Sequence, residues 1–281
     1  MSGSTSIAHA LPACALLCLI GCANNPTPSW SDTAEAYVRA DDLPSAIAIT
    51  ESAMHANPED PYYPARLAAL LKAQGDDFFQ REAWTLADDR YQRANLLGGP
   101  DFPSPEQERR HAHVKTKLDQ PWPDIALHLE RAWRADADPQ CLHRLALGWD
   151  DFGDSTAAME YYQHLVELPS PPPHLQLRLA ALRIQHQDFD RAAETLTALL
   201  TQQPDSPSAL ALLAQCHEAR GHLDDAHQLF QKIAEQNPDK AAPWRQLADF
   251  CQRHGRSDCL QIASQQLEAL SPQERKLRPL R

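Results

Sequence analysis

Apolar positions recur at steps of three and four along most of the chain, and Pro207–Lys240 shows the arrangement most clearly. The spacing predicts a first helix, capped by Ser206, whose buried face carries Leu210, Leu213, Ala214 and His217. Gly221 adopts positive φ readily and predicts a turn. A second helix is then expected to carry Ala226, Phe230 and Ile233 and to end before Pro238, because a residue preceding proline avoids the α region.

The same residue types return every 34 residues, so the stretch is one unit of a repeat. The matching sets are Leu145, Leu179, Leu213 and Leu247; Ala146, Ala180, Ala214 and Ala248; Ala158, Ala192 and Ala226; Tyr162, Leu196 and Phe230; and Pro204, Pro238 and Pro272. They define four regular units, 139–172, 173–206, 207–240 and 241–274. Because one helical hairpin cannot bury its own apolar stripe, the units are expected to stack on one another.

The unit that starts at Ala241 carries a more specific pattern, with Trp244, Leu247, Ala248, Gly255 and Pro272 in order. This pattern resembles the tetratricopeptide repeat, although Leu260 and Ser264 depart from the family's preferred Ala and Phe, as suits a terminal repeat. The resemblance implies an all-α, right-handed superhelical α-solenoid of about six to seven repeats. In that family the first helix of each repeat lines a concave groove.

Weaker repeats precede the regular ones, at 31–60, 61–101 and 105–138, which gives a solenoid over 31–274 and a basic tail at 275–281. About seven residues are inserted between the helices of the second repeat, so Asp76–Trp84 is expected to be an extended turn or a lengthened helix. The clearest break in the chain is at 98–103. Four glycines are expected at hairpin turns: Gly75, Gly153, Gly221 and Gly255.

The first 22 residues contain no Asp, Glu, Lys or Arg, and an apolar run extends from Ala10 to Ile20. Such a run is too short to span a bilayer comfortably and is typical of an export signal. Leu19–Cys22 resembles a bacterial lipobox, which implies a signal peptide at 1–21, lipidation of Cys22 and a tether at 22–30. The absence of Asp after Cys22 implies, by the same resemblance, the outer membrane facing the periplasm. The alternatives are a chance match and an N-terminal membrane anchor that is never cut.

A net charge of −12 disfavours nucleic-acid binding, because neutralising phosphates requires clustered Lys and Arg. The chain shows no Gly-rich phosphate loop, no Gly-x-Ser-x-Gly elbow and no His-Glu-x-x-His. We therefore expect no catalytic residue, no cofactor and no metal. His111 and His113 beside Glu108 are the densest metal candidates, but helix positions two apart point in different directions. We interpret them as a solvated helix face.

Four cysteines follow the lipobox, and two alternatives remain for them. Cys251 and Cys259 lie on the two helices of one hairpin, so a disulfide is possible in an oxidising periplasm. Spacing does not show whether their Cα atoms approach closely enough to be joined. Buried free thiols are the default interpretation of all four, Cys141, Cys216, Cys251 and Cys259.

The resemblance also supplies candidates for a peptide-binding groove on the regular first helices: His143, Asp150, His174, Gln215, Glu218, Arg245, Asp249 and Gln252. Relatives that grip a C-terminal carboxylate use Lys and Asn at positions held here by His143 and Leu147, which argues against that mode. A mixed-charge groove with apolar steps suits an extended peptide or a helix from another envelope protein.

The sequence therefore predicts a non-enzymatic lipoprotein that acts as a protein–protein interaction scaffold or adaptor in the bacterial cell envelope. It is expected to bind a partner protein in the groove and to be anchored to the membrane through a lipid on Cys22. Two alternatives stay open. One is a soluble or inner-membrane-anchored scaffold, and the other is an accessory subunit that delivers substrate to a separate enzyme.

Overall fold

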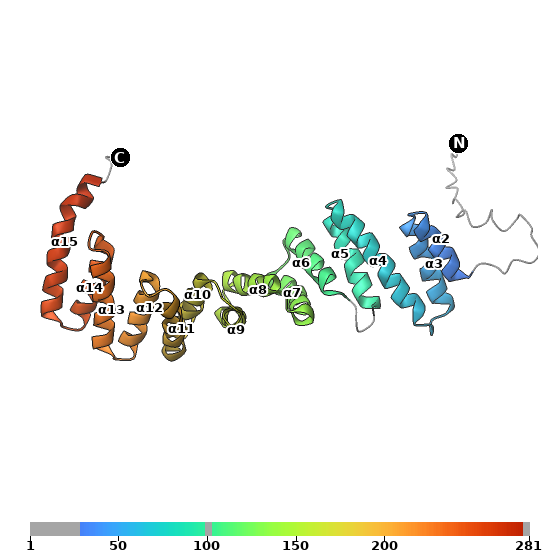
Figure 1. The fold of residues 1–281 in the computed structure, drawn as a ribbon. Helices are drawn as coiled ribbons and strands as arrows, with labels where there is room; N and C mark the ends of the chain where they lie inside the picture. The colour runs from blue at the N-terminus through green and yellow to red at the C-terminus, as the bar shows by residue number, and fades with distance from the viewer. Residues whose placement is uncertain (1–28, 99–102, 278–281) are drawn as a thin grey trace, which may run out of the picture. The chain divides into compact units, whose positions relative to one another are not determined.

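The computed structural model describes residues 29–98 and 103–277, with side chains as far as residue 270. These residues form fourteen helices and no strand (Figure 1). Each helix packs mainly against its neighbour in sequence, and the helices pair into seven hairpins. The predicted all-α solenoid is confirmed. The predictions for the signal peptide at 1–21, for Cys22 and for most of the tether fall outside the described residues.

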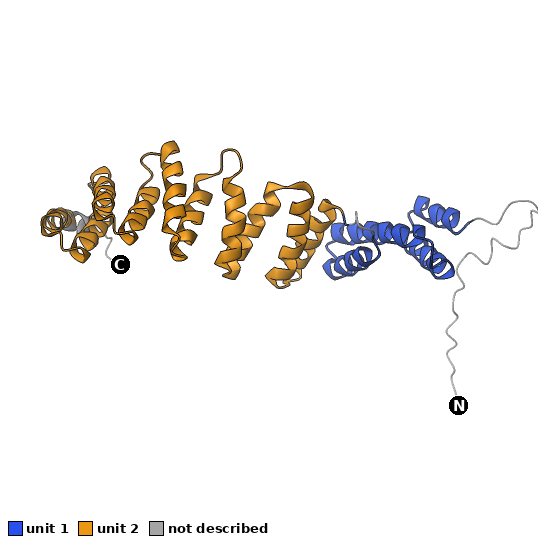
Figure 2. Cartoon of the chain, turned by 90° about the horizontal axis from the view of Figure 1, so that it is seen from below, with its two compact units in different colours: residues 1–103 blue, residues 104–281 orange. Residues whose placement is uncertain are grey.

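Contacts divide the chain into two compact units, residues 1–103 and 104–281 (Figure 2). The boundary lies at the Gly- and Pro-rich break that the sequence indicates at 98–103.

Unit 1 contains two hairpins, made of α2 (Trp30–Arg39), α3 (Leu43–Ala56), α4 (Tyr62–Gln80) and α5 (Trp84–Leu97). The N-caps follow from sequence: Ser29 accepts from the Asp32 amide in a capping box, and Asp42 accepts from the Ser45 amide. The core between the helices consists of small and branched side chains, namely Ala46, Ile47, Leu67, Leu70, Leu71 and Ala94.

The insertion in the second hairpin is a lengthened first helix, since α4 continues to Gln80 and α5 begins at Trp84. The prediction that Gly75 forms the hairpin turn is wrong, because Gly75 is buried inside α4. A Cβ there would lie 2.8 Å from the ring of Tyr91 on α5, so the glycine permits a close approach of the two helices.

Unit 2 contains five hairpins. The first, the predicted degenerate repeat, consists of α6 (Pro105–Lys117) and α7 (Trp122–Asp136). The four regular units follow as α8 (Pro139–Phe152) and α9 (Ser155–Val166), α10 (Pro173–Gln185) and α11 (Phe189–Gln202), α12 (Pro207–Ala219) and α13 (Leu223–Gln236), and α14 (Ala241–Arg253) and α15 (Ser257–Leu277). Both the first and the second helices of these hairpins begin at 34-residue intervals, as the recurrence predicts.

Local chemistry accounts for the helix boundaries of unit 2. Asp138, Asp154 and Asp188 cap α8, α9 and α11 through side-chain hydrogen bonds to backbone amides. Ser206 is the N-cap residue of α12, but its side chain makes no capping hydrogen bond. Three of the predicted turn glycines are confirmed: Gly153, Gly221 and Gly255 have φ of 93°, 78° and 65°. The first three residues of the predicted tail continue α15.

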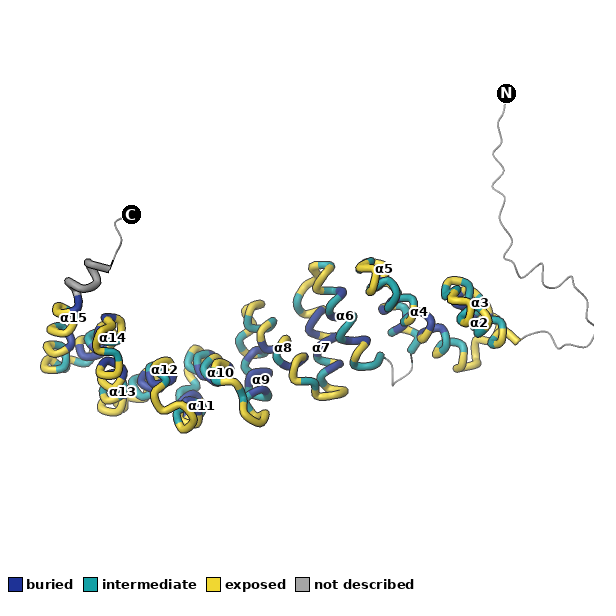
Figure 3. Tube along the Cα trace, turned by 45° about the horizontal axis from the view of Figure 1, so that its top comes forward, coloured by how far each residue is buried: buried dark blue, intermediate teal, exposed yellow. Residues whose placement is uncertain are grey.

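Buried positions of unit 2 lie where neighbouring helices face one another (Figure 3). The recurring leucines and alanines form three core clusters that follow the chain. The clusters meet on the first helices of hairpins, since α10 gives Leu179 to one cluster and Ala180 to the next. In the same way, α12 divides Leu213 and Leu210 between two clusters. The predicted stacking is therefore observed: neighbouring hairpins bury one another's apolar faces.

Candidate functional site

The predicted groove residues of unit 2 lie on its four regular first helices, and we call them the first-helix face. Five are exposed: His174 on α10, Gln215 on α12, and Arg245, Asp249 and Gln252 on α14. Three are half-buried: His143 and Asp150 on α8, and Glu218 on α12. These positions were chosen by resemblance to the repeat family, and their role in binding stays a prediction.

Asp150 is occupied by a contact between consecutive first helices. Arg178 of α10 donates from Nε to Oδ2 at 2.6 Å and from Nη2 to Oδ1 at 2.5 Å, and the Tyr162 hydroxyl donates to Oδ2 at 3.2 Å. The hydrogen bonds from Arg178 hold the pKa of Asp150 below its ordinary value. A bidentate pair of this kind fixes geometry as well as charge. Asp150 therefore joins two hairpins and does not project as a free acid.

Glu218, at the equivalent position two hairpins later, also forms an ion pair with a residue of another first helix. Arg253 of α14 donates to Glu218 from Nε at 3.0 Å and from Nη2 at 2.9 and 3.0 Å. His254 Nε2 lies 2.7 Å from Oε1 of the same carboxylate. A partner that reaches this position would meet an ion pair, with Arg253 more exposed than Glu218.

A hollow of about 920 Å³ lies among α9, α10 and α11, and none of the eight predicted groove residues lines it. Its lining is charged and mixed in sign, with Glu160, Glu194, Arg183 and Arg191 among the residues. Arg183 is bonded there to Gln163, to Thr195 and to the Arg191 carbonyl. Burial lowers the pKa of Arg183. Residues of the second helices α9 and α11 form much of the lining, and the resemblance to the repeat family places the binding groove on first helices.

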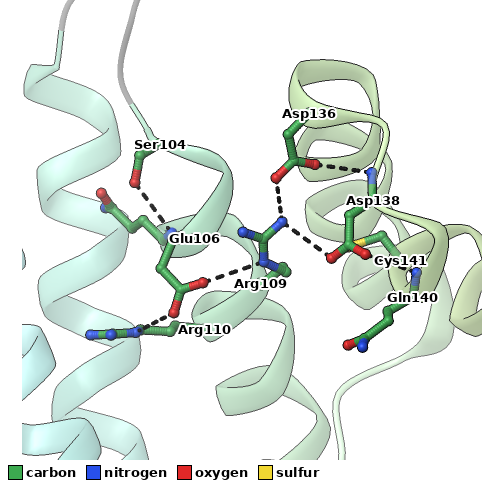
Figure 4. Close-up of polar contacts among 9 residues, drawn as sticks. Ser104, Glu106, Arg109, Arg110, Asp136, Asp138, Gln140 and Cys141 are labelled. Carbon is green, nitrogen blue, oxygen red and sulfur yellow. Dashed lines mark hydrogen bonds and ion pairs between the residues drawn. The ribbon is translucent and has the colours of Figure 1, made fainter.

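Arg109 organises the junction between the first two hairpins of unit 2 (Figure 4). Its Nη1 lies 2.5 Å from Asp136 Oδ2 at the end of α7 and 3.4 Å from Asp138, the residue that caps α8. The hydrogen bond from Arg109 lowers the pKa of Asp136. These contacts satisfy one another, so we interpret the cluster as a structural connection between hairpins.

The interpretation of Glu108 and His111 as a solvated helix face is wrong. Both are buried, with 1 % of each exposed, and His128 of α7 is 6 % exposed beside them. His128 Nδ1 lies 2.5 Å from Glu108 Oε2. His111 and the half-buried His113 are two residues apart and point in different directions, whereas Glu108 and His111 are three apart and share a helix face. That i, i+3 spacing was the signal available in the sequence.

The four cysteines in the described residues form one disulfide and two buried free thiols. The structure joins Cys251 and Cys259 by a disulfide, with the Cα atoms 5.9 Å apart, a spacing normal for such a bond. Cys141 and Cys216 are buried thiols. Burial raises the pKa of Cys141, and it raises that of Cys216 to about 11, so neither thiol is activated as a nucleophile.

Two overlapping segments, residues 151–216 and 183–249, match the family model described as tetratricopeptide repeat. These segments are tetratricopeptide repeats. The matched residues, 151–249, lie within the regular hairpins, and the match agrees with the recurrence at 34 residues. The family match thus falls in the part of the chain where the recurrence is found. Among curated proteins, none matches this sequence.

Several solved structures are similar to this chain at low sequence identity. The complex described as Naa15/Naa10 bound to HypK-THB contains a chain with a TM-score of 0.57 and 15% identity, covering 86% of this chain and 37% of that one. The C-terminal part of a TPR repeat-containing protein from Cytophaga hutchinsonii has a TM-score of 0.49 and 13% identity, covering 85% and 95% of the two chains. MamA from Desulfovibrio magneticus RS-1 has a TM-score of 0.49 and 16% identity, covering 62% and 97%.

Among the described helices, none is both long enough and apolar enough to cross a membrane.

Proposed function

We propose that the chain is a non-enzymatic scaffold of the bacterial cell envelope, anchored through a lipid on Cys22, whose tetratricopeptide repeats bind another protein. The observation that supports binding is the first-helix face of unit 2. Successive first helices present side chains at equivalent register positions. Along the face, the residues at these positions change from mostly apolar on α10 to mostly polar on α14. Because stacked repeats keep such positions in line, the face suits an elongated ligand.

The residues at equivalent repeat positions indicate what chemistry such a ligand would need. One row of equivalent positions reads Leu147, Ala181, Gln215 and Asp249 from α8 to α14, and another reads His143, Leu177, Ala211 and Arg245. The second and third members of the latter row are apolar, and Leu147 is 44 % exposed. The polar members that are exposed gather on α12 and α14. The ligand that fits is an amphipathic peptide or helix with apolar side chains toward α8 and α10.

A photo-crosslinking amino acid at position 215 tests the binding proposal in cells that express the full chain. The matched control is the same probe at Gln228, another exposed glutamine, on the second helix of the same hairpin. We expect one defined adduct from position 215 and none from position 228. The same adduct should appear from position 249. Equal labelling from positions 215 and 228, or none from positions 215 and 249, would contradict binding on the first-helix face.

The anchor is tested separately, because its support is the lipobox-like sequence. Cells fed a palmitate analogue with a clickable tag should label the chain, and Cys22→Ala should abolish the label. Mass spectrometry of the purified N-terminus should find acylated Cys22. An N-terminus that still begins at Met1 would refute the anchor while leaving the repeat proposal untouched.

A further inference from the structure

Three buried side chains with metal-binding chemistry meet between α6 and α7. Glu108 and His111 come from one face of α6, and His128 comes from α7. Their exposed fractions are 1 %, 1 % and 6 %. Glutamate is almost never fully buried unless it is paired or coordinates a metal, because transferring its charge out of water costs several kcal/mol.

The partners that Glu108 has in the described chain leave it incompletely satisfied. One oxygen, Oε2, lies 2.5 Å from His128 Nδ1. The other oxygen, Oε1, is buried and has no hydrogen-bond partner. Arg131 lies near this oxygen, with its Nη1 3.6 Å away and its side chain 52 % exposed. Glu108 therefore keeps one buried oxygen without a hydrogen bond, and the imidazole rings of His111 and His128 lie beside this residue with their centroids 4.0 Å apart.

The three groups lie close enough together to reach one zinc ion after their side chains move. One ligand atom from each residue lies within 4.8 Å of the other two. Two histidines and one glutamate are a ligand set that Zn²⁺ uses, with bonds of about 2.0–2.2 Å and a fourth position for water. Tetrahedral ligands at those bond lengths are about 3.4 Å apart. The 2.5 Å contact would have to open by about 1 Å and the longer separations to shorten, which side-chain rotation can supply.

We propose that Glu108, His111 and His128 bind one Zn²⁺ ion, which holds α6 against α7. This inference departs from the sequence expectation of no metal. It also accounts for a peculiarity of the hairpin: three of the five buried residues of α6 are polar, namely Gln107, Glu108 and His111. A metal bond would add to the cohesion that the buried apolar residues of this hairpin, among them Ala112, Ile125 and Leu129, already provide.

Two other groups in the described chain bring three candidate ligands together, and both are weaker. In the group of His217, His222 and Asp225, the last two side chains are exposed. In the group of His227, Cys251 and Cys259, the two sulfur atoms are already joined in a disulfide. Metal experiments on the full chain therefore need controls for both groups.

The test is zinc titration of the purified full chain after removal of metals with a chelator. A chromogenic chelator competes for ZnCl2, and elemental analysis after gel filtration counts the ions retained. All samples stay oxidised, so that the disulfide is intact. We expect one Zn²⁺ per chain, and a visible d–d absorption band of tetrahedral type when Co²⁺ replaces it. Saturating Zn²⁺ should raise the Tm by about 5 °C or more.

Glu108→Gln and His128→Gln test the assignment, with His113→Gln on the same helix and His222→Gln in the exposed group as controls. The first two should weaken zinc binding by more than about 100-fold, since even outer-shell partners of a metal cost about 10- to 100-fold. The two controls should bind as the wild type does. Folding of each variant is checked by circular dichroism.

Three results would overturn the proposal: a folded wild type that retains no zinc, undiminished binding by Glu108→Gln and His128→Gln, or loss of binding in His222→Gln. If the first two variants do not fold, the wild type decides. Absence of both the Co²⁺ band and the Zn²⁺-dependent rise in Tm would then overturn it.

Discussion

Gly148 in the middle of α8 lies against the indole ring of Trp122 at the start of α7. A Cβ added at Gly148 would come within 2.0 Å of two ring carbons, Cζ2 and Cη2. Ordinary contact begins at about 3.4 Å, so the ring or the helix would have to move by more than 1 Å. Trp122 is restrained because its ring packs edge-on against Trp149, with the centroids 6.2 Å apart.

Gly148→Ala sets two effects against each other. Alanine in a helix interior is favoured over glycine by about 0.8–1 kcal/mol. Overpacking of a filled core costs about 1–3 kcal/mol. With an overlap as deep as this the steric cost is expected at the upper end, so the substitution should destabilise unit 2 by about 1–2 kcal/mol. Propensity alone predicts the opposite sign.

The assay is urea denaturation followed by far-UV circular dichroism, which does not depend on tryptophan fluorescence. Trp122→Ala removes the ring, and in that background Gly148→Ala should become stabilising by about 1 kcal/mol. This reversal of sign in a double-mutant cycle is the specific expectation. If Gly148→Ala stabilises the wild type, or if its effect is the same in both backgrounds, the close contact between Gly148 and Trp122 is absent in solution.

Three further predictions concern the core, the ion pairs and the disulfide. Leu145→Ala, at a fully buried position, should cost about 2.7–5 kcal/mol in urea denaturation, whereas exposed Leu147→Ala should stay within about 0.5 kcal/mol of the wild type; equal effects would refute the register. Asp150→Asn should cost about 1 kcal/mol at pH 7 by breaking the pair with Arg178. Since the folded pKa of Asp150 is depressed below 3.8, that contribution is present at neutral pH and is lost as pH falls through the folded value, so wild type and variant should converge in stability curves measured toward pH 2. Reduction of the disulfide between α14 and α15 should lower stability by about 2.5 kcal/mol, and identical denaturation curves with and without reductant would contradict it.

The sequence predicted the regular hairpins well because their signal is repeated four times. Helix starts at Pro139, Pro173, Pro207 and Ala241 follow from the apolar stripe and from proline in the first turn. Because each apolar stripe must be buried against the next hairpin, the pattern determines which residues are helical and which face of each helix is buried. The periodic part of the fold is therefore encoded locally.

Features that depend on a particular partner were not predictable in this way. Gly75 followed by two aspartates has the composition of a turn, yet the ring of Tyr91 packs over it and α4 continues. His128 lies twenty residues from Glu108, so their contact depends on the register of α6 against α7. Asp150 and Glu218 stand at equivalent repeat positions, but the arginines that pair with them lie at different distances along the sequence. These contacts belong to tertiary packing and have no periodic signal.

Two first helices of the regular hairpins, α10 and α12, contribute to the cluster before them and to the cluster after them, as Leu179 and Ala180 do on α10. Each such helix therefore has one surface for its predecessor and another for its successor. Removing or duplicating a 34-residue segment between equivalent positions would give every remaining helix a neighbour of the same kind. A gene for such a chain can shorten or grow by whole hairpins during evolution without redesign of the interior.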